Sequence, residues 1–264
     1  MQKKRQMKKI IDSHCHIFEI LAPQKEKNIN ISKLIDSFKK NGVHKAVLLA
    51  IDGFSSNRFV ENIYKTHKEF FWIFYNFNPF AAKVEDSMAE LDKGFFSGVK
   101  IHPRLHGFSL QDKNIINFFK KLETSVHIPV LVDAWFSDHD PDKLIKELIW
   151  FVNEFNGFDI ILAHSGGFKF NKIVELAGDR HVYVDTSYIL NTFVKYQKYD
   201  MIEGYMKRLK QIDSSKILFG SDYPECEIKE SIQLVSHYLN EFGFSLEDKE
   251  KIFFSNSLEL LNRC

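Results

Sequence analysis

Short apolar segments alternate with amphipathic segments along almost the whole chain. Runs such as VHKAVLLAI, FFWIFYNF and IPVLVDA are apolar nearly throughout, which is typical of buried strands. The segments between them carry apolar residues at helical spacing, as at Phe59, Ile63 and Tyr64, which predicts helices. We predict eight strands, at residues 10–16, 43–51, 70–77, 98–102, 128–134, 158–164, 181–187 and 216–222.

This alternation predicts an α/β fold with a parallel sheet. Strands that are short, continuous apolar runs are typical of parallel sheets covered by helices on both faces. Eight repeats in a chain of 264 residues favour a (β/α)8 TIM barrel, formed as a single domain over residues 1–264. A doubly wound open sheet is the alternative, but no GxGxxG segment follows any strand.

Composition and charge narrow the choice of partner and compartment. The formal net charge is +1, which does not indicate a nucleic-acid partner. The basic N-terminal tail, residues 1–9, is expected to be solvated, and no apolar signal region follows it. No segment is apolar for long enough to span a bilayer. The three cysteines lack CxxC spacing, so a reducing, cytoplasmic location is expected. The expected partner is a small-molecule substrate.

The first predicted strand carries two histidines one residue apart. Side chains at i and i+2 of a strand point to the same face, so His14 and His16 are expected to lie side by side. Neighbouring imidazoles are good ligands for a borderline cation such as zinc. An isolated pair would be interpreted as surface histidines at a strand end. Here further ligand-type residues end the later strands, which favours a metal site.

Polar residues close most of the other apolar runs. In a barrel of this kind the active site lies at the C-terminal ends of the strands, so such residues can converge. Together they have the donor types of a catalytic metal site. They are Lys100, His102, Asp133, His164, Asp185, Ser187 and Asp222.

The segments IDSHCH, GVKIHP, IILAHSGG and KILFGSDYP resemble the amidohydrolase superfamily. More narrowly, they are similar to the amidohydrolase-2 branch, which includes the aminocarboxymuconate-semialdehyde decarboxylase-like enzymes. The resemblance spans nearly the whole chain and implies a barrel that holds one divalent metal, commonly zinc, at its strand ends. Dimers are common among such barrels, so a homodimer is a further expectation.

The resemblance also implies roles for individual residues. His14 and His16 match the ligands of the first strand. His164 matches a histidine that positions or deprotonates metal-bound water, and it is also a candidate metal ligand. Asp222 matches a ligand that can also take the proton. Asp133 stands where the family usually has a histidine ligand. A carboxylate there would bind metal but favour manganese or iron over zinc, or it would mark partial loss of the site.

Five residues are candidates for substrate binding. They are Lys100, His102, Arg104, Trp135 and Tyr223. In two-metal amidohydrolases a lysine at the position of Lys100 is carboxylated and bridges the metals, which this branch mostly lacks. We favour Lys100 as a charged group beside the substrate, and a structural ion pair is the alternative.

Three functions are compatible with these residues. The first is metal-dependent hydrolysis of a small amide, lactone or ester, in which His164 and Asp222 take a proton from the attacking water. The second is non-oxidative decarboxylation of an unsaturated or aromatic acid at the same site. The third, suggested by Asp133, is a metal-binding or ligand-binding barrel without catalysis.

Overall fold

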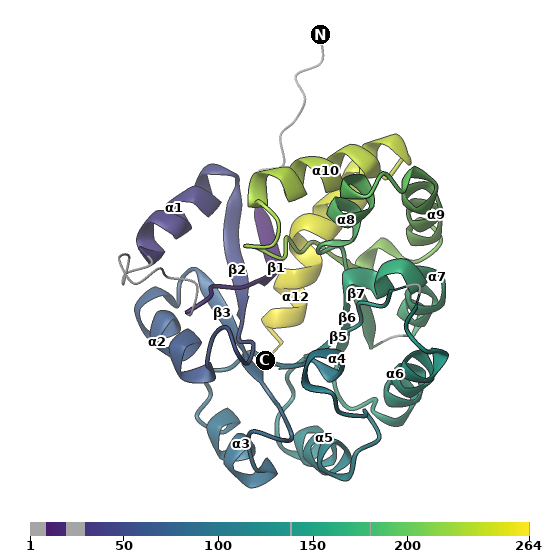
Figure 1. Ribbon diagram of the computed structural model, residues 1–264. Helices are drawn as coiled ribbons and strands as arrows, with labels where there is room; N and C mark the ends of the chain where they lie inside the picture. The colour runs from purple at the N-terminus through teal and green to yellow at the C-terminus, as the bar shows by residue number, and fades with distance from the viewer. Residues whose placement is uncertain (1–8, 20–29, 138, 180, 264) are drawn as a thin grey trace.

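Eight parallel strands, joined side by side in sequence order, form the centre of the computed structural model (Figure 1). The structure describes residues 9–19, 30–137, 139–179 and 181–263, so the predicted basic tail lies outside them except for Lys9. All eight predicted strands are present. They are β1 (Ile10–Cys15), β2 (Val43–Leu49), β3 (Phe71–Asn76), β4 (Gly98–Ile101), β5 (Val130–Asp133), β6 (Ile160–Ala163), β7 (Val182–Asp185) and β8 (Ile217–Leu218).

Backbone hydrogen bonds between β1 and the segment after β8 close the sheet into a barrel. Ser13 N–H donates to Phe219 O at 2.9 Å, and Asp222 N–H donates to His14 O at 2.8 Å. A parallel bridge between Cys15 and Tyr223 continues this pairing. The prediction of a (β/α)8 barrel is therefore confirmed, and closure excludes the open doubly wound sheet.

Helices surround the strands (Figure 1). The helical segment at the C-terminal end of the described chain is divided into α11, a π-helical turn η4 and α12. The helices are α1 (Ile31–Lys40), α2 (Asn57–His67), α3 (Val84–Leu91), α4 (Pro103–His106), α5 (Lys113–Ser125), α6 (Asp142–Glu154), α7 (Phe170–Ile173), α8 (Ile189–Lys195), α9 (Tyr199–Leu209), α10 (Ile228–Glu241), α11 (Leu246–Glu250) and α12 (Asn256–Leu261). The shorter turns are η1 (His164–Lys169), η2 (Val174–Gly178), η3 (Ser214–Lys216) and η4 (Lys251–Ser255).

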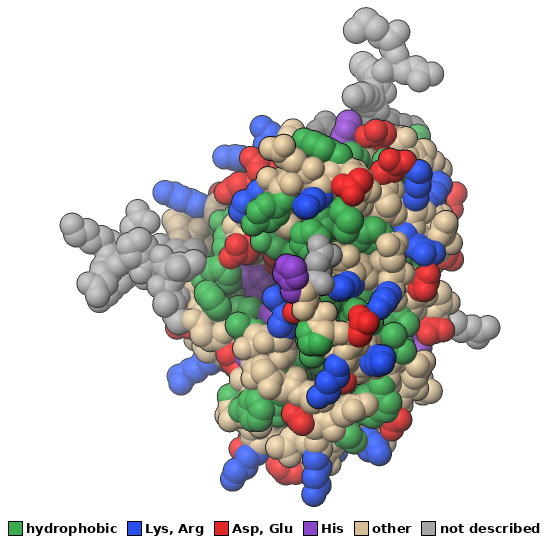
Figure 2. Space-filling model, turned by 45° about the vertical axis from the view of Figure 1, so that its right-hand side comes forward, with side chains coloured by type: hydrophobic (Ala, Val, Ile, Leu, Met, Phe, Trp, Pro, Cys, Tyr) green, Lys and Arg blue, Asp and Glu red, His purple; other side chains and the backbone are tan. Residues whose placement is uncertain are grey.

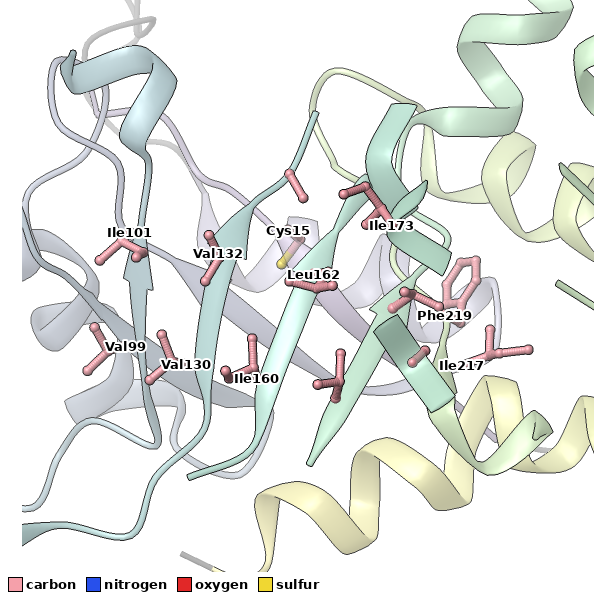
Figure 3. Packing of buried hydrophobic residues seen from close by; sticks show 14 of the residues in the cluster. Cys15, Val99, Ile101, Val130, Val132, Ile160, Leu162, Ile173, Ile217 and Phe219 are labelled. Carbon is pink, nitrogen blue, oxygen red and sulfur yellow. The ribbon is translucent and has the colours of Figure 1, made fainter. Parts of the chain in front are cut away.

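The alternation of side chains along each strand builds two hydrophobic cores. The outer core lies between strands and helices and contains Val99, Val130 and Ile160 among others (Figure 3). The inner core fills the barrel and includes Trp72 and Phe74 from alternate positions of β3. Side chains at the same parity near the ends of the strands must therefore point into the barrel.

Helix α12 packs against the N-terminal side of the barrel interior. Its Leu260 and Leu261 belong to the inner core together with Ile11 of β1 and Leu218 of β8. The opposite, C-terminal end is where the polar residues that close the strands lie. Within the described residues, no helix combines the length and hydrophobicity needed to cross a bilayer.

Gly98 tests the packing of the inner core. A Cβ atom at this position would lie 2.4 Å from the nearest ring atom of Phe74, which is fully buried. We expect Gly98→Ala to lower the free energy of unfolding by about 1–3 kcal/mol through overpacking. Gly178→Ala is the matched control, because nothing lies within 4 Å of its Cβ position. Urea unfolding followed by circular dichroism checks this, and equal midpoints for the two variants would contradict it.

Candidate metal centre

The two histidines of β1 face the barrel interior because the strand carries a bulge. Ile11 belongs to the inner core, whereas Cys15, four residues later, belongs to the outer core. Residues four apart in a regular strand share a face, so the strand must be interrupted between them. The register with β2 indeed shifts between Asp12 and Cys15. His14 and His16 consequently point inward and are almost fully buried.

Asp185, the last residue of β7, determines how the His14 ring is used. Its carboxylate can only accept, so His14 Nδ1–H donates to Asp185 Oδ2, at 2.9 Å. His14 Nε2 is then the ring nitrogen that faces Asp222. It lies 3.2 Å from Asp222 Oδ1, but the two atoms are not aligned for a hydrogen bond, and Nε2 is buried without a partner. This nitrogen is an open ligand position, because it offers a lone pair to a metal ion once its proton is released.

His16 is oriented in the same way by the backbone. Its Nδ1–H donates to Leu49 O at 3.0 Å, which leaves Nε2 at 3.6 Å from Asp222 Oδ1. The ligand atoms of His14, His16 and Asp222 all lie within 4.8 Å of one another. Two imidazole nitrogens and a carboxylate oxygen suit a divalent ion such as zinc, and the unpartnered Nε2 of His14 shows that these residues fit one.

The electrostatic environment shifts the pKa values of His14 and His16 in opposite directions. Burial by itself lowers the pKa of His14, but the carboxylate of Asp185 outweighs it and raises this pKa to about 9. Burial and the nearby Lys100 hold the pKa of His16 well below its ordinary value, so His16 is neutral. Burial raises the pKa of Asp222, but the neighbouring His14 lowers it more, so Asp222 stays ionised.

His164 lies next to this set and contacts a different carboxylate. Its Nδ1–H donates to Ser187 Oγ at 2.9 Å, and its Nε2 lies 3.3 Å from Asp133 Oδ2. His164 also forms a second group of potential ligands with His14 and Asp185. The structure therefore brings the four histidine and aspartate positions expected from the resemblance, His14, His16, His164 and Asp222, to one end of the barrel.

Asp133 is paired with histidines in this structure. His102 Nδ1 accepts the N–H of Leu105, so His102 Nε2–H is free to donate to Asp133 Oδ2, 3.2 Å away. Burial lowers the pKa of His102 to about 3, which keeps the ring neutral. Asp133 belongs to neither group of potential ligands found among the described residues. Its predicted role as a metal ligand stays a prediction.

Lys100 is buried inside the barrel, with its Nζ 3.3 Å from His16 Nε2. Burial lowers its pKa, while the charges of Asp133 and Asp222 act in the opposite direction. Among the described residues no carboxylate lies within 4 Å of Nζ, so a direct structural ion pair is not formed. Lys100 instead offsets the negative charge of several buried carboxylates that lie more than 4 Å away.

Two of the predicted substrate residues border the site. Arg104, in α4, places Nε 3.9 Å from Asp133 Oδ1 and is partly exposed. The ring of Trp135 lies edge-on to His164, with centroids 6.0 Å apart. Both line a pocket beside Asp133. Figure 2 shows a hollow in the surface with histidine side chains at its bottom.

Tyr223 is placed differently. Its ring packs edge-on against Phe38 of α1, with centroids 5.3 Å apart, and it is partly buried against the outer core. Its backbone carbonyl accepts the N–H of His16 at 2.6 Å. The substrate role of Tyr223 therefore stays a prediction.

Asp185 is the residue whose role the sequence does not reveal. It is a polar residue at a strand end, but the sequence around it does not indicate its partners. In the structure it accepts the Nδ1–H of His14 and also the backbone N–H of His164, at 2.8 Å. Gly220 has a similar supporting role, because a Cβ there would lie 2.8 Å from His14 Cβ. His164 and Asp222 both have positive φ, a backbone conformation that is costly outside glycine and that often marks functional sites.

Comparison with known proteins identifies the class. A family model described as Amidohydrolase matches residues 11–263, so the chain belongs to the amidohydrolase family, in its amidohydrolase-2 branch. This confirms the resemblance carried by the four sequence segments. A search of curated proteins gave no match.

Solved structures share the fold across nearly the whole chain. A zinc-bound amidohydrolase from Burkholderia multivorans is 14% identical over 96% of this chain and 99% of its own, with a TM-score of 0.73. A probable 2-pyrone-4,6-dicarboxylic acid hydrolase from Acinetobacter baumannii is 16% identical over 96% and 99%, with a TM-score of 0.66. A 5-carboxyvanillate decarboxylase from Sphingomonas paucimobilis is 10% identical over 97% and 99%, with a TM-score of 0.67.

The role of Asp185 can be tested by metal affinity. We expect Asp185→Asn to weaken zinc binding about 10–100-fold, because the charge that orients and polarises His14 is lost. Asp36→Asn, at an exposed position of α1, is the control and should bind like wild type. Competition with a chromophoric zinc chelator measures both. Wild-type affinity in Asp185→Asn would show that the contact to His14 has no such role.

Metal loading should also stabilise the folded chain. A ligand present at 100 times its dissociation constant stabilises the native state by about 2.7 kcal/mol. We therefore expect zinc to raise the midpoint of thermal unfolding of the wild type, and chelation to reverse the rise. His14→Ala should show little shift. An equal shift in both proteins would place the binding elsewhere.

Proposed function

We propose that this protein is a metal-dependent hydrolase of a small lactone, ester or amide. In this proposal His14, His16 and Asp222 hold one divalent ion, with zinc as the first choice and manganese or iron as alternatives. The observation that carries it is the convergence of two buried, correctly oriented Nε2 atoms on Asp222 Oδ1. The zinc-bound amidohydrolase and the probable hydrolase among the solved structures support it.

A divalent ion bound there supplies Lewis acidity and lowers the pKa of coordinated water towards ~7. His164 is the better of the two predicted proton acceptors. Its Nδ1–H is committed to Ser187, so Nε2 holds a lone pair, and Asp133 Oδ2 at 3.3 Å stabilises the imidazolium after protonation. Asp222 is the weaker base, because its pKa is held below the ordinary value.

The substrate contacts proposed are those that border the site. Arg104 offers a partly exposed guanidinium that can bind a carboxylate or carbonyl oxygen, and Trp135 offers an apolar wall beside His164. His102 orients Asp133 and, through it, His164. Lys100 contributes positive charge next to His16.

Decarboxylation of a small unsaturated or aromatic acid is the second candidate. The cationic groups of Lys100 and Arg104 near the predicted metal ligands favour an anionic substrate, and one structural neighbour is a decarboxylase. Product analysis separates the reactions. Hydrolysis incorporates ¹⁸O from labelled water, whereas decarboxylation releases carbon dioxide without net addition of water.

A screen of lactones, esters, amides and carboxylic acids with the zinc-loaded protein tests the function. We expect turnover that falls by about 10²–10⁴-fold in His164→Asn, because general base catalysis is lost, with unchanged metal content. His181→Asn is the control, since the His181 ring contacts Val152 O away from the site.

Undiminished turnover in His164→Asn would contradict the mechanism. Turnover that persists in both His14→Ala and Asp222→Asn would contradict the metal centre. A metal-loaded wild type that turns over nothing in the screen would favour the non-catalytic barrel.

A further inference from the structure

Unpartnered polar atoms are concentrated at one end of the barrel. Nine buried side-chain nitrogen and oxygen atoms among the described residues have no hydrogen-bond partner, and six of these belong to four residues at or just after the strand ends. These residues are His14, Asn76, His106 and Asp133. His14 and Asp133 belong to the site already described, whereas Asn76 and His106 have no assigned role.

Asn76 is the last residue of β3 and is only 4% exposed. Trp72 and Phe74 of the same strand belong to the inner core, so the side chain of Asn76 points into the barrel. Its Cα pairs in register with that of Lys100, whose Nζ reaches His16. The amide of Asn76 therefore lies on the side of the barrel that leads to the metal centre.

The Asn76 side chain has no structural use in this fold. Its backbone N–H and carbonyl are both bonded by the side chain of Asn57, but its own Nδ2 and Oδ1 have no partner. Asn256 shows what a structural buried asparagine does, because its Nδ2 donates to Ser214 O and Ile217 O. A buried amide without a hydrogen-bond partner destabilises the free protein. Such a residue is expected where a bound ligand supplies the missing hydrogen bonds.

His106, in α4 directly after β4, lies at the same end of the barrel. Its side chain is 6% exposed, and its ring centroid is 6.0 Å from that of His102. Nε2 is 3.6 Å from Asp52 Oδ2, too far for a good hydrogen bond, and Nδ1 has no partner. Burial lowers the pKa of His106, so the ring is neutral and offers one donor and one acceptor.

We propose that the amide of Asn76 forms a subsite for a hydroxyl group of the substrate, beside the metal centre, and that His106 is a second polar group at this end of the barrel. The amide of Asn76 offers both a donor and an acceptor, which matches the single donor and two lone pairs of a hydroxyl. The carboxylate of Asp52 next to His106 disfavours an anionic group there. The proposal rests on the proposed function, because it takes the metal centre as the place of reaction.

Matched probe pairs that differ by one hydroxyl test the subsite. They are α-hydroxy-γ-butyrolactone against γ-butyrolactone, lactamide against propionamide, and lactate against propionate. With the zinc-loaded wild type, calorimetric titration should give dissociation constants that differ by 10-fold or more within at least one pair, with the hydroxylated probe bound more tightly. In Asn76→Leu the separation should fall to within about twofold, with unchanged zinc content. No separation in the wild type, or a separation that survives in Asn76→Leu, overturns the subsite.

Stability provides an independent readout. Asn76→Leu should keep or raise the urea midpoint, because it removes an unpaired buried amide. Asn256→Leu, the matched control, should lower it, because two hydrogen bonds are lost. An equal fall in both variants overturns the proposal.

The failure of the subsite and the failure of the proposed function can be told apart. A hydroxylated probe bound through Asn76 but never hydrolysed contradicts the hydrolase alone, and hydrolysis unaffected by Asn76→Leu contradicts the subsite alone.

Discussion

The hydrogen bond from His14 Nδ1 to Asp185 Oδ2 is the interaction on which the candidate centre depends. It joins the first and seventh strands, orients the His14 ring and leaves Nε2 directed at Asp222. The same carboxylate holds the backbone of His164 through its other oxygen. One buried side chain therefore orients both the ligand position and the proposed proton acceptor, so the two cannot shift independently.

Buried charge is balanced across the site as a whole. Asp133, Asp185 and Asp222 are all buried, and their low pKa values keep them ionised. Lys100 and the imidazole of His14 supply the compensating positive charge. Such an arrangement is costly unless every partner is present, which makes the site dependent on the rigid apolar barrel beneath it.

The pattern of apolar residues was sufficient to predict the eight strands, because a strand that is buried on both faces is a nearly continuous apolar run in the sequence. The histidines and Asp222 were also predictable, through their place at strand ends and the family resemblance. The bulge in β1 was not, because it arises from pairing with β2. The partners of Asp133 and Asp185 were equally hidden, since Asp185 contacts a histidine of β1, and Asp133 contacts a histidine that follows the neighbouring β4.

The barrel itself explains why the unpaired polar groups gather where they do. On several strands an inner-core residue is followed two positions later by a polar one that points the same way, beyond the last apolar layer. The pairs are Phe74 and Asn76, Leu131 and Asp133, and Tyr183 and Asp185. A side chain at this end of the strand has no apolar layer above it. Its polar atoms must therefore bond to side chains of other strands or to a ligand. Asp185 bonds to His14 of β1, two strands away round the barrel, whereas the amide of Asn76 has no partner. This difference separates a residue that builds the site from one that binds its ligand.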